Sequence, residues 1–281
     1  EIRILRRVRH TNIALFHGAV IEEGTEGTPY QELGNKTATL LLVMERIHGV
    51  SLGTCIQRMK AQEAKSRHAA VQINLMLQVM NALIYLHTRS PVIVHGDLKP
   101  DNIMVERCGD TLVPKLLDFG LSRIVTRNAK LLGGTPAYVA PEIVALARAY
   151  KPNASADVFS LGRVLFFVAS GRRPYTGFSA RSMIDLMKRG EAPPPLKWEP
   201  ETFLLGVQRT IIERCTSYAP EDRPPVNEVY DMIAESGTTA GLTSGTPTRA
   251  SPTASTSATR TDTPTSQQTS GSDKGREAGR E

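Results

Sequence analysis

The chain has 281 residues, 40% of them hydrophobic, so it is long enough to bury a sizeable core in one or two domains. Its net charge is +6, but the basic residues are scattered and only 5% of residues are aromatic, which disfavours a nucleic-acid partner. The cysteines, Cys55, Cys108 and Cys215, form no C-x-x-C pair, so neither a zinc site nor a disulfide framework is indicated, and an intracellular, cytoplasmic setting is expected.

The first segment, residues 1–9, is predicted to be a helix because Ile2, Leu5 and Val8 recur at three-residue spacing with arginines between them. The chain does not begin with Met and opens inside this helical pattern, so we expect a fragment of a longer protein. No signal peptide is visible, and no uninterrupted apolar run approaches the ~18 residues of a membrane helix, so no membrane partner is expected.

Short apolar runs predict the next elements. Residues 13–21 and 39–45 are rich in aliphatic and β-branched side chains, which predicts two strands joined by a polar loop. Helices are expected over residues 52–59 and 69–88, and the second carries apolar residues at steps of three and four.

The middle of the chain is predicted to contain short strands and turns. Residues 92–94 form a short expected strand, and two apolar runs flanking Gly109-Asp110, over 103–105 and 114–117, predict a hairpin. Residues 121–134 are polar and predict a flexible loop. Further helices are predicted over residues 157–171, 203–216 and 226–235.

The composition changes near Gly237. From there to Glu281, Ser, Thr, Gly and Ala dominate, and no large apolar residue follows Leu242. Such a segment cannot bury enough apolar surface to offset its chain entropy, so we expect it to be disordered. The sequence therefore predicts a folded domain over residues 1–236 and a tail over 237–281.

The most informative stretch is His-Gly-Asp-Leu-Lys-Pro-Asp-Asn, which begins at His95, and it is followed by an Asp-Phe-Gly sequence at Asp118. Two carboxylates, an amide and an ammonium that converge suit phosphoryl transfer, in which a protein positions a hydroxyl, a polyphosphate and Mg²⁺. Asp97 would accept the hydroxyl proton, and Lys99 would spread the charge on the moving phosphoryl group. Asn102 and Asp118 are hard oxygen ligands suited to Mg²⁺.

These residues resemble the catalytic loop and Asp-Phe-Gly motif of eukaryotic protein kinases. Further motifs follow in the kinase order: a segment from Gly134 that ends in Ala-Pro-Glu at Glu142, Asp-Val-Phe-Ser-Leu-Gly from Asp157, and Arg-Pro at Arg223. The resemblance covers about residues 1–235. It implies the bilobal α+β kinase fold.

In that fold, residues 1–47 resemble a truncated small lobe with helix C and the later strands, and residues 48–236 resemble the mostly helical large lobe. Glu1 falls on the helix C Glu that pairs with the nucleotide-anchoring Lys. Met44, Glu45 and Ile47 fall on the hinge, whose backbone groups hold the adenine of ATP, with Met44 at the back of the pocket. The resemblance thus implies ATP and Mg²⁺ as cofactors. The anchoring Lys and the Gly-rich loop are absent from the chain, so its own activity is left open.

The resemblance also assigns structural roles. His95 would pack against Phe119, and both would join Leu5 and Phe16 in a stacked apolar spine. Glu142 and Arg223 would form a buried ion pair that fixes the segment ending in Ala-Pro-Glu.

Gly96 departs from the family pattern, which usually has Arg at this position. That Arg binds a phosphate on the activation loop, so we expect activity without loop phosphorylation, and in particular without Thr126.

Lys99 and Thr135 resemble the Ser/Thr branch of the family. The expected function is therefore transfer of the ATP γ-phosphoryl group to Ser or Thr of a protein substrate. Two alternatives stay open. His-Gly-Asp also resembles small-molecule kinases of the aminoglycoside-phosphotransferase type, and the chain could serve as a pseudokinase or interaction module. The substrate, the pathway and the oligomeric state do not follow from the sequence.

Overall fold

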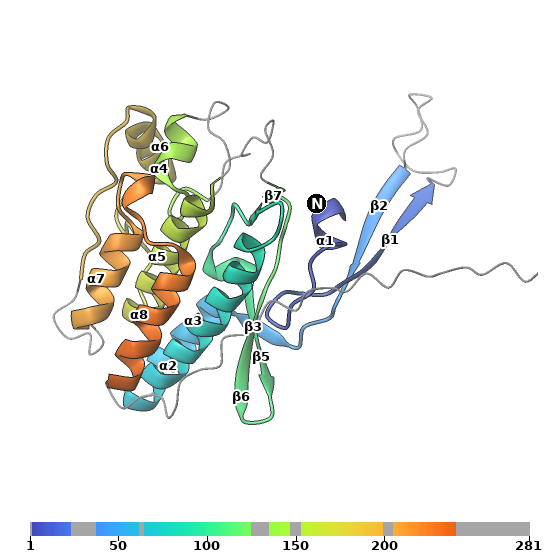
Figure 1. The fold of residues 1–281 in the computed structure, drawn as a ribbon, viewed down its shortest axis with the longest axis horizontal. Helices are drawn as coiled ribbons and strands as arrows, with labels where there is room; N and C mark the ends of the chain where they lie inside the picture. The colour runs from blue at the N-terminus through green and yellow to red at the C-terminus, as the bar shows by residue number, and fades with distance from the viewer. Residues whose placement is uncertain are drawn as a thin grey trace, which may run out of the picture. The chain divides into compact units, whose positions relative to one another are not determined.

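The computed structural model describes residues 2–23, 38–61, 65–124, 135–146, 153–198 and 205–239 (Figure 1). Some of the sequence-based predictions lie outside these ranges: Glu1, the polar loop between the first two strands, most of the loop over residues 121–134, the start of the helix over 203–216, and the tail after residue 239.

The chain opens with a short helix, α1 (Ile2–Leu5), followed by two antiparallel strands, β1 (Phe16–Glu23) and β2 (Ala38–Met44). The two strands are the predicted ones, with ends shifted by one to three residues. The helix is shorter than predicted, because the N–H groups of Arg7 and Val8 bond carbonyls only three residues back and tighten the chain into a turn.

A second sheet has the strand order β3-β5-β6, all antiparallel, built from β3 (Gly49–Ser51), β5 (Ile103–Cys108) and β6 (Thr111–Leu116). The hairpin predicted around Gly109-Asp110 is confirmed, since Cys108 pairs with Thr111 and Ile103 with Leu116. A third pair joins β4 (Ile93–Val94) to β7 (Arg123–Ile124). These short strands bracket the predicted catalytic loop.

Helices make up most of the rest of the described chain. Their bounds are α2 (Leu52–Lys60), α3 (Lys65–His87), α4 (Pro141–Ala145), α5 (Ala154–Ser170), α6 (Ala180–Lys188), α7 (Leu205–Cys215) and α8 (Val226–Thr239), with single 3₁₀ turns at Pro100–Asn102 and Pro220–Asp222. The helix α3 contacts α8, α5 and β6, and α7 contacts both α5 and α8 (Figure 1). Together these elements confirm the α+β prediction.

The helix α5 is the buried centre of the helical part. Asn153 caps its start by accepting a hydrogen bond from the Ser155 N–H, and Gly171 ends it with a left-handed φ of 67°. At Gly162 the neighbouring helix α7 comes so close that a Cβ would lie 2.8 Å from Cβ of Cys215. Because a side chain has no room there, this glycine sets the spacing between the two helices.

The long helix α3 also bears on the membrane prediction. Among the described helices, its His68–His87 stretch is the one long and apolar enough to cross a membrane by length and composition. Polar residues interrupt this stretch, so it does not form the continuous apolar run that the sequence analysis looked for. Since 67% of the stretch is buried inside the fold, it matches the core helix of a globular domain equally well.

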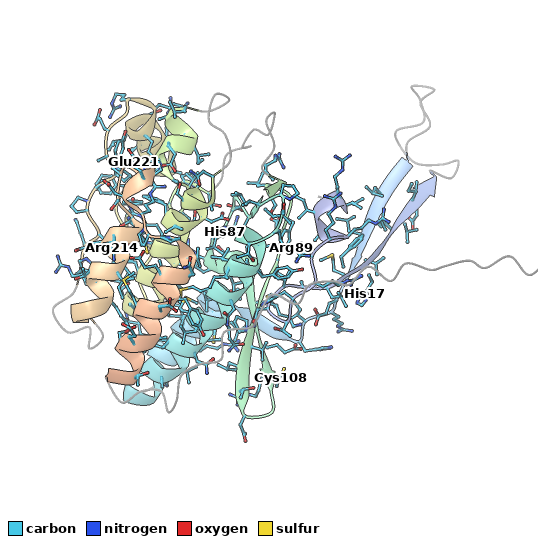
Figure 2. All side chains as sticks on the ribbon, in the orientation of Figure 1. His17, His87, Arg89, Cys108, Arg214 and Glu221 are labelled. Carbon is cyan, nitrogen blue, oxygen red and sulfur yellow. The ribbon has the colours of Figure 1, made fainter. Side chains whose placement is uncertain are left out.

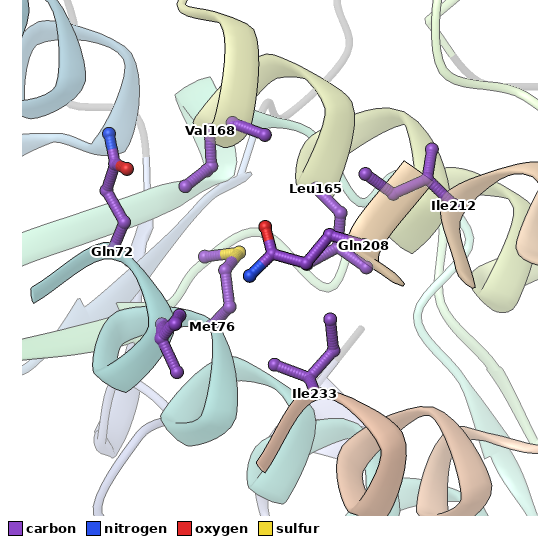
Figure 3. A pocket seen from close by; sticks show the side chains of 9 residues that line it. Gln72, Met76, Leu165, Val168, Gln208, Ile212 and Ile233 are labelled. Atoms are coloured by element: carbon purple, nitrogen blue, oxygen red, sulfur yellow. The ribbon is translucent and has the colours of Figure 1, made fainter. Parts of the chain in front are cut away.

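A small cavity lies between α3, α5, α7 and α8, and Figure 3 shows the side chains that line it. Met76, Leu165 and Ile233 supply apolar walls, and the amide of Gln208 points in among them. Gln208 is itself buried. The cavity volume of about 20 Å³ suffices for one water molecule.

Four elements were missed by the sequence prediction: β3, α4, α6 and β7, the last within the stretch 121–134 that was predicted to be a loop. The helix α6 is amphipathic, with Met183 and Met187 buried and the Ser179 side chain capping its start. This cap and the spacing of the two methionines are the signals that could have revealed it. Conversely, α8 continues to Thr239, past residue 237 where the tail was expected to begin.

Candidate active site

The loop after β4 is anchored by one buried carboxylate. Asp157, on α5, accepts hydrogen bonds from the backbone N–H of His95 at 2.8 Å and of Gly96 at 2.9 Å. The Nε2 atom of His87, labelled in Figure 2 at the end of α3, lies 2.8 Å from the same carboxylate. Asp157 has no exposed surface, so these three partners replace the water that it would otherwise bind.

These contacts change the acidity of Asp157. Burial by itself would raise the pKa of this carboxyl, but the hydrogen bond and charge of His87 and the N–H of Gly96 outweigh it. The net effect is a pKa below the usual range. Asp157 is therefore ionised at neutral pH and holds the loop through charge-assisted bonds.

His95 fixes the loop from inside, as the resemblance implied. Its ring packs 5.2 Å from the ring of Phe119, its Nε2 lies 3.0 Å from the Leu117 carbonyl, and its Nδ1 accepts from the Asp97 N–H. Leu5 and Phe16, the other predicted spine residues, are buried in the same core cluster as Phe119. The spine residues thus lie in one core.

Asp97 is the centre of a small polar network. Lys99 Nζ donates to its Oδ2 at 2.5 Å, and Asn102 Nδ2 donates to the same oxygen at 3.0 Å. The hydroxyl and the N–H of Thr135 donate to its Oδ1 at 2.9 and 3.1 Å. Lys99 also donates to the Thr135 hydroxyl at 2.9 Å. The structure therefore brings together Asp97, Lys99 and Asn102 and adds Thr135.

Asp118 lies next to this network rather than within it. The N–H of Leu117 donates to the Asn102 carbonyl at 2.8 Å. Asp118 follows Leu117 directly, so this bond keeps Asp118 near the end of the catalytic loop. Asp118 is exposed, has a left-handed φ of 55°, and its Oδ1 accepts from the Gly120 N–H. A non-glycine residue in this region is strained, a feature common where the chain presents a functional group.

The oxygens of Asn102 and Asp118 fit a magnesium ion. Asn102 donates through Nδ2 to the carbonyl and carboxylate of Asp97, which leaves its Oδ1 as a ligand atom. Asp118 uses one oxygen for Gly120 and retains the other. A carboxylate and an amide oxygen, completed by phosphate and water, form the hard-ligand set that Mg²⁺ takes in nucleotide sites.

The predicted hinge residues lie at the end of β2, which includes Met44, and directly after it. The N–H of Glu45 donates to the Leu15 carbonyl at 2.7 Å, and its carboxylate accepts from Lys115 at 2.6 Å. Burial would raise the pKa of Glu45, but the Lys115 hydrogen bond and the Leu15 N–H lower it overall. Ile47 makes no hydrogen bond to another described residue, so its N–H remains available. Met44 is partly buried and packs on the main core.

Lys115 connects the hinge to the catalytic loop. It lies on β6, two residues before Leu117, which bonds the Asn102 carbonyl. Glu45 and Asn102 are therefore tied to one short stretch of chain. This salt bridge was not predicted, because a Lys in a strand pattern gives no sign of its partner.

The segment after Thr135 is anchored by the predicted ion pair. Arg223 Nη1 and Nη2 donate to the two carboxylate oxygens of Glu142 at 2.7 and 2.8 Å. Arg223 also donates to the carbonyls of Ser155, Ser217 and Tyr218, so each nitrogen of the buried guanidinium has a partner. The pair joins α4 to the turn before α8.

Gly96 has a φ of 83°, a conformation that glycine adopts without steric cost. The Gly at this position therefore also meets a backbone requirement.

Asp157 and His87 are the functional residues that the sequence reading missed. Asp157 is the first residue of a motif that the sequence analysis recognised. The motif does not indicate that the Asp157 carboxylate points toward the catalytic loop.

A family model for the protein kinase domain matches residues 1–232. The chain belongs to the protein kinase family. This kinase domain is 29% identical over 234 residues to the probable serine/threonine-protein kinase drkD of Dictyostelium discoideum, covering 83% of the chain and 16% of that relative. It is also 29% identical over 240 residues to the serine/threonine-protein kinase CTR1 of Arabidopsis thaliana, covering 83% of the chain and 26% of the relative.

A third relative is the lectin-domain containing receptor kinase VI.3 of Arabidopsis thaliana, which is 32% identical over 199 residues. The match covers 68% of the chain and 26% of that relative. The chain thus spans about a quarter or less of the length of these curated relatives.

Proposed function

We propose that this kinase domain transfers the γ-phosphoryl group of Mg-ATP to a Ser or Thr hydroxyl of a protein substrate. The observation that carries the proposal is the Asp97 carboxylate, which is shared between Lys99, Asn102 and the acceptor-side residue Thr135. The relatives named as serine/threonine kinases support the hydroxyl class.

In this proposal Asp97 orients the acceptor hydroxyl and takes its proton as the phosphoryl group moves. Lys99 lies within hydrogen-bond distance of both Asp97 and Thr135, so its ammonium can stabilise charge that develops between them. Asn102 and Asp118 would hold Mg²⁺, which supplies charge neutralisation on the phosphates. Backbone groups at Glu45 and Ile47, in front of Met44, would hold the adenine, and Glu1 would pair with an anchoring Lys.

Thr135 favours a protein acceptor over a small molecule. Its hydrogen bonds to Asp97 couple the catalytic loop to the segment that the Glu142–Arg223 pair fixes. A small-molecule kinase has no need for a fixed peptide-docking segment beside its base. The predicted independence from loop phosphorylation is part of the proposal, and retention of activity by Thr126→Ala tests it.

The test is a phosphotransfer assay on the parent polypeptide, with Ser/Thr peptides and an aminoglycoside as alternative acceptors and Asp97→Asn as the control. Loss of a general base reduces turnover by about 10²–10⁴-fold, so we expect peptide phosphorylation that Asp97→Asn lowers by at least 100-fold. Phosphorylation of the aminoglycoside alone would support the small-molecule alternative. Equal turnover by Asp97→Asn would count against every version in which Asp97 is the base, and no heat on titration with Mg-ATP would support the interaction module.

A further inference from the structure

A second pocket, distant in sequence from the catalytic loop, lies beside α6. Its walls come from Phe166 on α5, the loop over residues 172–178 and the segment that ends at Lys197. The volume is about 120 Å³, which suits one or two side chains rather than a nucleotide. We call it the basic pocket, because its lining includes Arg172, Arg173 and Lys197.

The charged residues that line the basic pocket within the described ranges are all basic. No Asp or Glu side chain lines it within the described ranges, and Arg173 and Lys197 are both exposed at its rim. The rings of Phe166, Tyr175 and Phe178 form its apolar walls. Low-dielectric walls around charges of one sign concentrate the field and raise the local concentration of anions.

The pocket is preformed. Tyr175 has a left-handed φ of 60°, and its carbonyl accepts from the Phe178 N–H at 3.0 Å. The Thr176 hydroxyl donates to the Arg173 carbonyl at 2.8 Å. The floor residue, Phe166, is buried and meets the ring of Trp198 edge-on. Because the walls are already ordered, a ligand would not have to order them on binding.

A buried cation lies beneath the pocket. The Arg163 guanidinium stacks 4.1 Å from the centre of the Tyr175 ring and 4.9 Å from that of Phe159. Its Nε and Nη1 atoms find no hydrogen-bond partner among the described residues. Burial lowers the pKa of Arg163 to about 9, so the group still carries its charge at neutral pH. This charge adds to the positive field of the pocket.

One wall residue of the pocket, Tyr175, also contacts the core beneath the segment that follows Thr135. Tyr175 packs on the apolar cluster that contains Val139 and Ala140, which follow Thr135 in sequence. Arg173 also acts on this segment: burial raises the pKa of Tyr138, and the positive charge of Arg173 opposes that rise. The pocket and the segment after Thr135 are therefore supported by one apolar cluster.

We propose that the basic pocket docks an acidic segment, rich in Asp or Glu, of the protein substrate. Complementary charge is the reason for this choice, and the position beside Val139 and Ala140 is the reason for a substrate rather than a distant partner. That the partner is a substrate rests on the proposed function. Docking of an acidic segment can be measured without any phosphotransfer.

The test measures binding directly, without nucleotide. A fluorescein-labelled peptide with a block of Glu residues is titrated with the chain at low salt, and fluorescence anisotropy gives Kd; a peptide with Gln in place of Glu is the reference. Arg173→Gln/Lys197→Gln is compared with Arg181→Gln/Lys188→Gln, which removes two exposed charges from α6 outside the pocket. Thermal unfolding by circular dichroism checks that both variants fold.

We expect the Glu peptide to bind more tightly than the Gln peptide, and the pocket variant to lose about five- to tenfold in affinity while the α6 variant loses less than twofold. Equal binding of the two peptides, or equal losses in the two variants, would overturn the proposal. Tighter binding of an oligonucleotide of equal charge, weakened by the pocket variant, would also overturn it. Asp97→Asn should bind the Glu peptide normally, so failed phosphotransfer leaves this result standing.

Discussion

The catalytic loop and the β1–β2 pair differ in which side chains they bury: polar groups are buried around the loop, and apolar ones are exposed on the two strands. Around the loop, Asp157 and Arg223 are buried and hydrogen-bonded to the groups that they hold. On β1 and β2, large apolar side chains face solvent: Ile21 is 69% exposed and Leu40 is 52% exposed. Two strands alone are marginally stable. The geometry of the loop therefore depends on the helical part of the chain, and the hairpin contributes little to it.

The first way to break this comparison is to remove the strongest anchor. Arg223→Ala leaves the carboxylate of Glu142 buried without its partner, so we expect a loss of about 3–5 kcal/mol in the free energy of unfolding. Chemical denaturation measures it. The control is Arg214→Ala, which breaks an exposed pair with Glu228 and should cost less than about 1 kcal/mol. Similar losses in both variants would mean that burial does not set the strength of the pair.

Asp157→Asn tests the carboxylate that anchors the catalytic loop. It should lower the free energy of unfolding by about 2–3 kcal/mol at pH 7, because two N–H groups and His87 lose a charged acceptor. The effect should depend on pH. The pKa of Asp157 is lower in the folded state than its usual value of 3.8, so its contribution is complete above about pH 4 and disappears as the pH falls further.

Unfolding curves at pH 7 and pH 3 measure this dependence. The gap in stability between wild type and Asp157→Asn should be smaller at pH 3. A gap of equal size at both values would contradict the proposed role of the ionised carboxylate.

A third test compares two glycines in helices. Gly162→Ala places a Cβ against Cys215 and Thr216 and should destabilise the chain by about 1–3 kcal/mol. Gly53→Ala, on α2, meets its nearest neighbour at 3.6 Å and should instead stabilise by about 0.5–1 kcal/mol through helix propensity. Melting temperatures of the two variants decide it, and a shift in the same direction for both would refute the close approach of α5 and α7.

The smallest effect is expected on the hairpin. Ile21→Thr/Leu40→Thr changes a cross-strand pair that faces solvent, so the free energy of unfolding should change by no more than about 0.5 kcal/mol. Exposed apolar strands promote association, so light scattering at high concentration should fall. A large loss of stability would show that the hairpin carries more of the fold than its exposure indicates.

Much of the site could be predicted from the sequence because its residues lie close together in the chain. Asp97, Lys99 and Asn102 share one loop, and their spacing alone brings them together. The Glu142–Arg223 pair spans 81 positions and was predicted only through resemblance to kinases. The partners His87 and Lys115 could not be predicted, because a single titratable residue in a helix or strand pattern does not reveal which buried group it faces.

Element boundaries followed the same logic. The hairpin at Gly109-Asp110 was predicted well because the turn residues fix its register locally. The helix α1 was overestimated, since an apolar repeat of three residues fits a tight turn as well as a longer helix. Short elements such as β3 owe their existence to pairing with β5, and such pairing leaves no local pattern.

The edge-on contact between Phe166 and Trp198 also gives the molecule a built-in optical probe. Trp198 is the sole tryptophan in the sequence, and its indole lies 4.9 Å from the ring that floors the basic pocket. The guanidinium carbon of Arg209 lies over the same indole, 5.8 Å from the ring centre. Intrinsic emission therefore reports a single location, so a change in its wavelength or quenching on adding an acidic peptide would need no label and could be followed in real time.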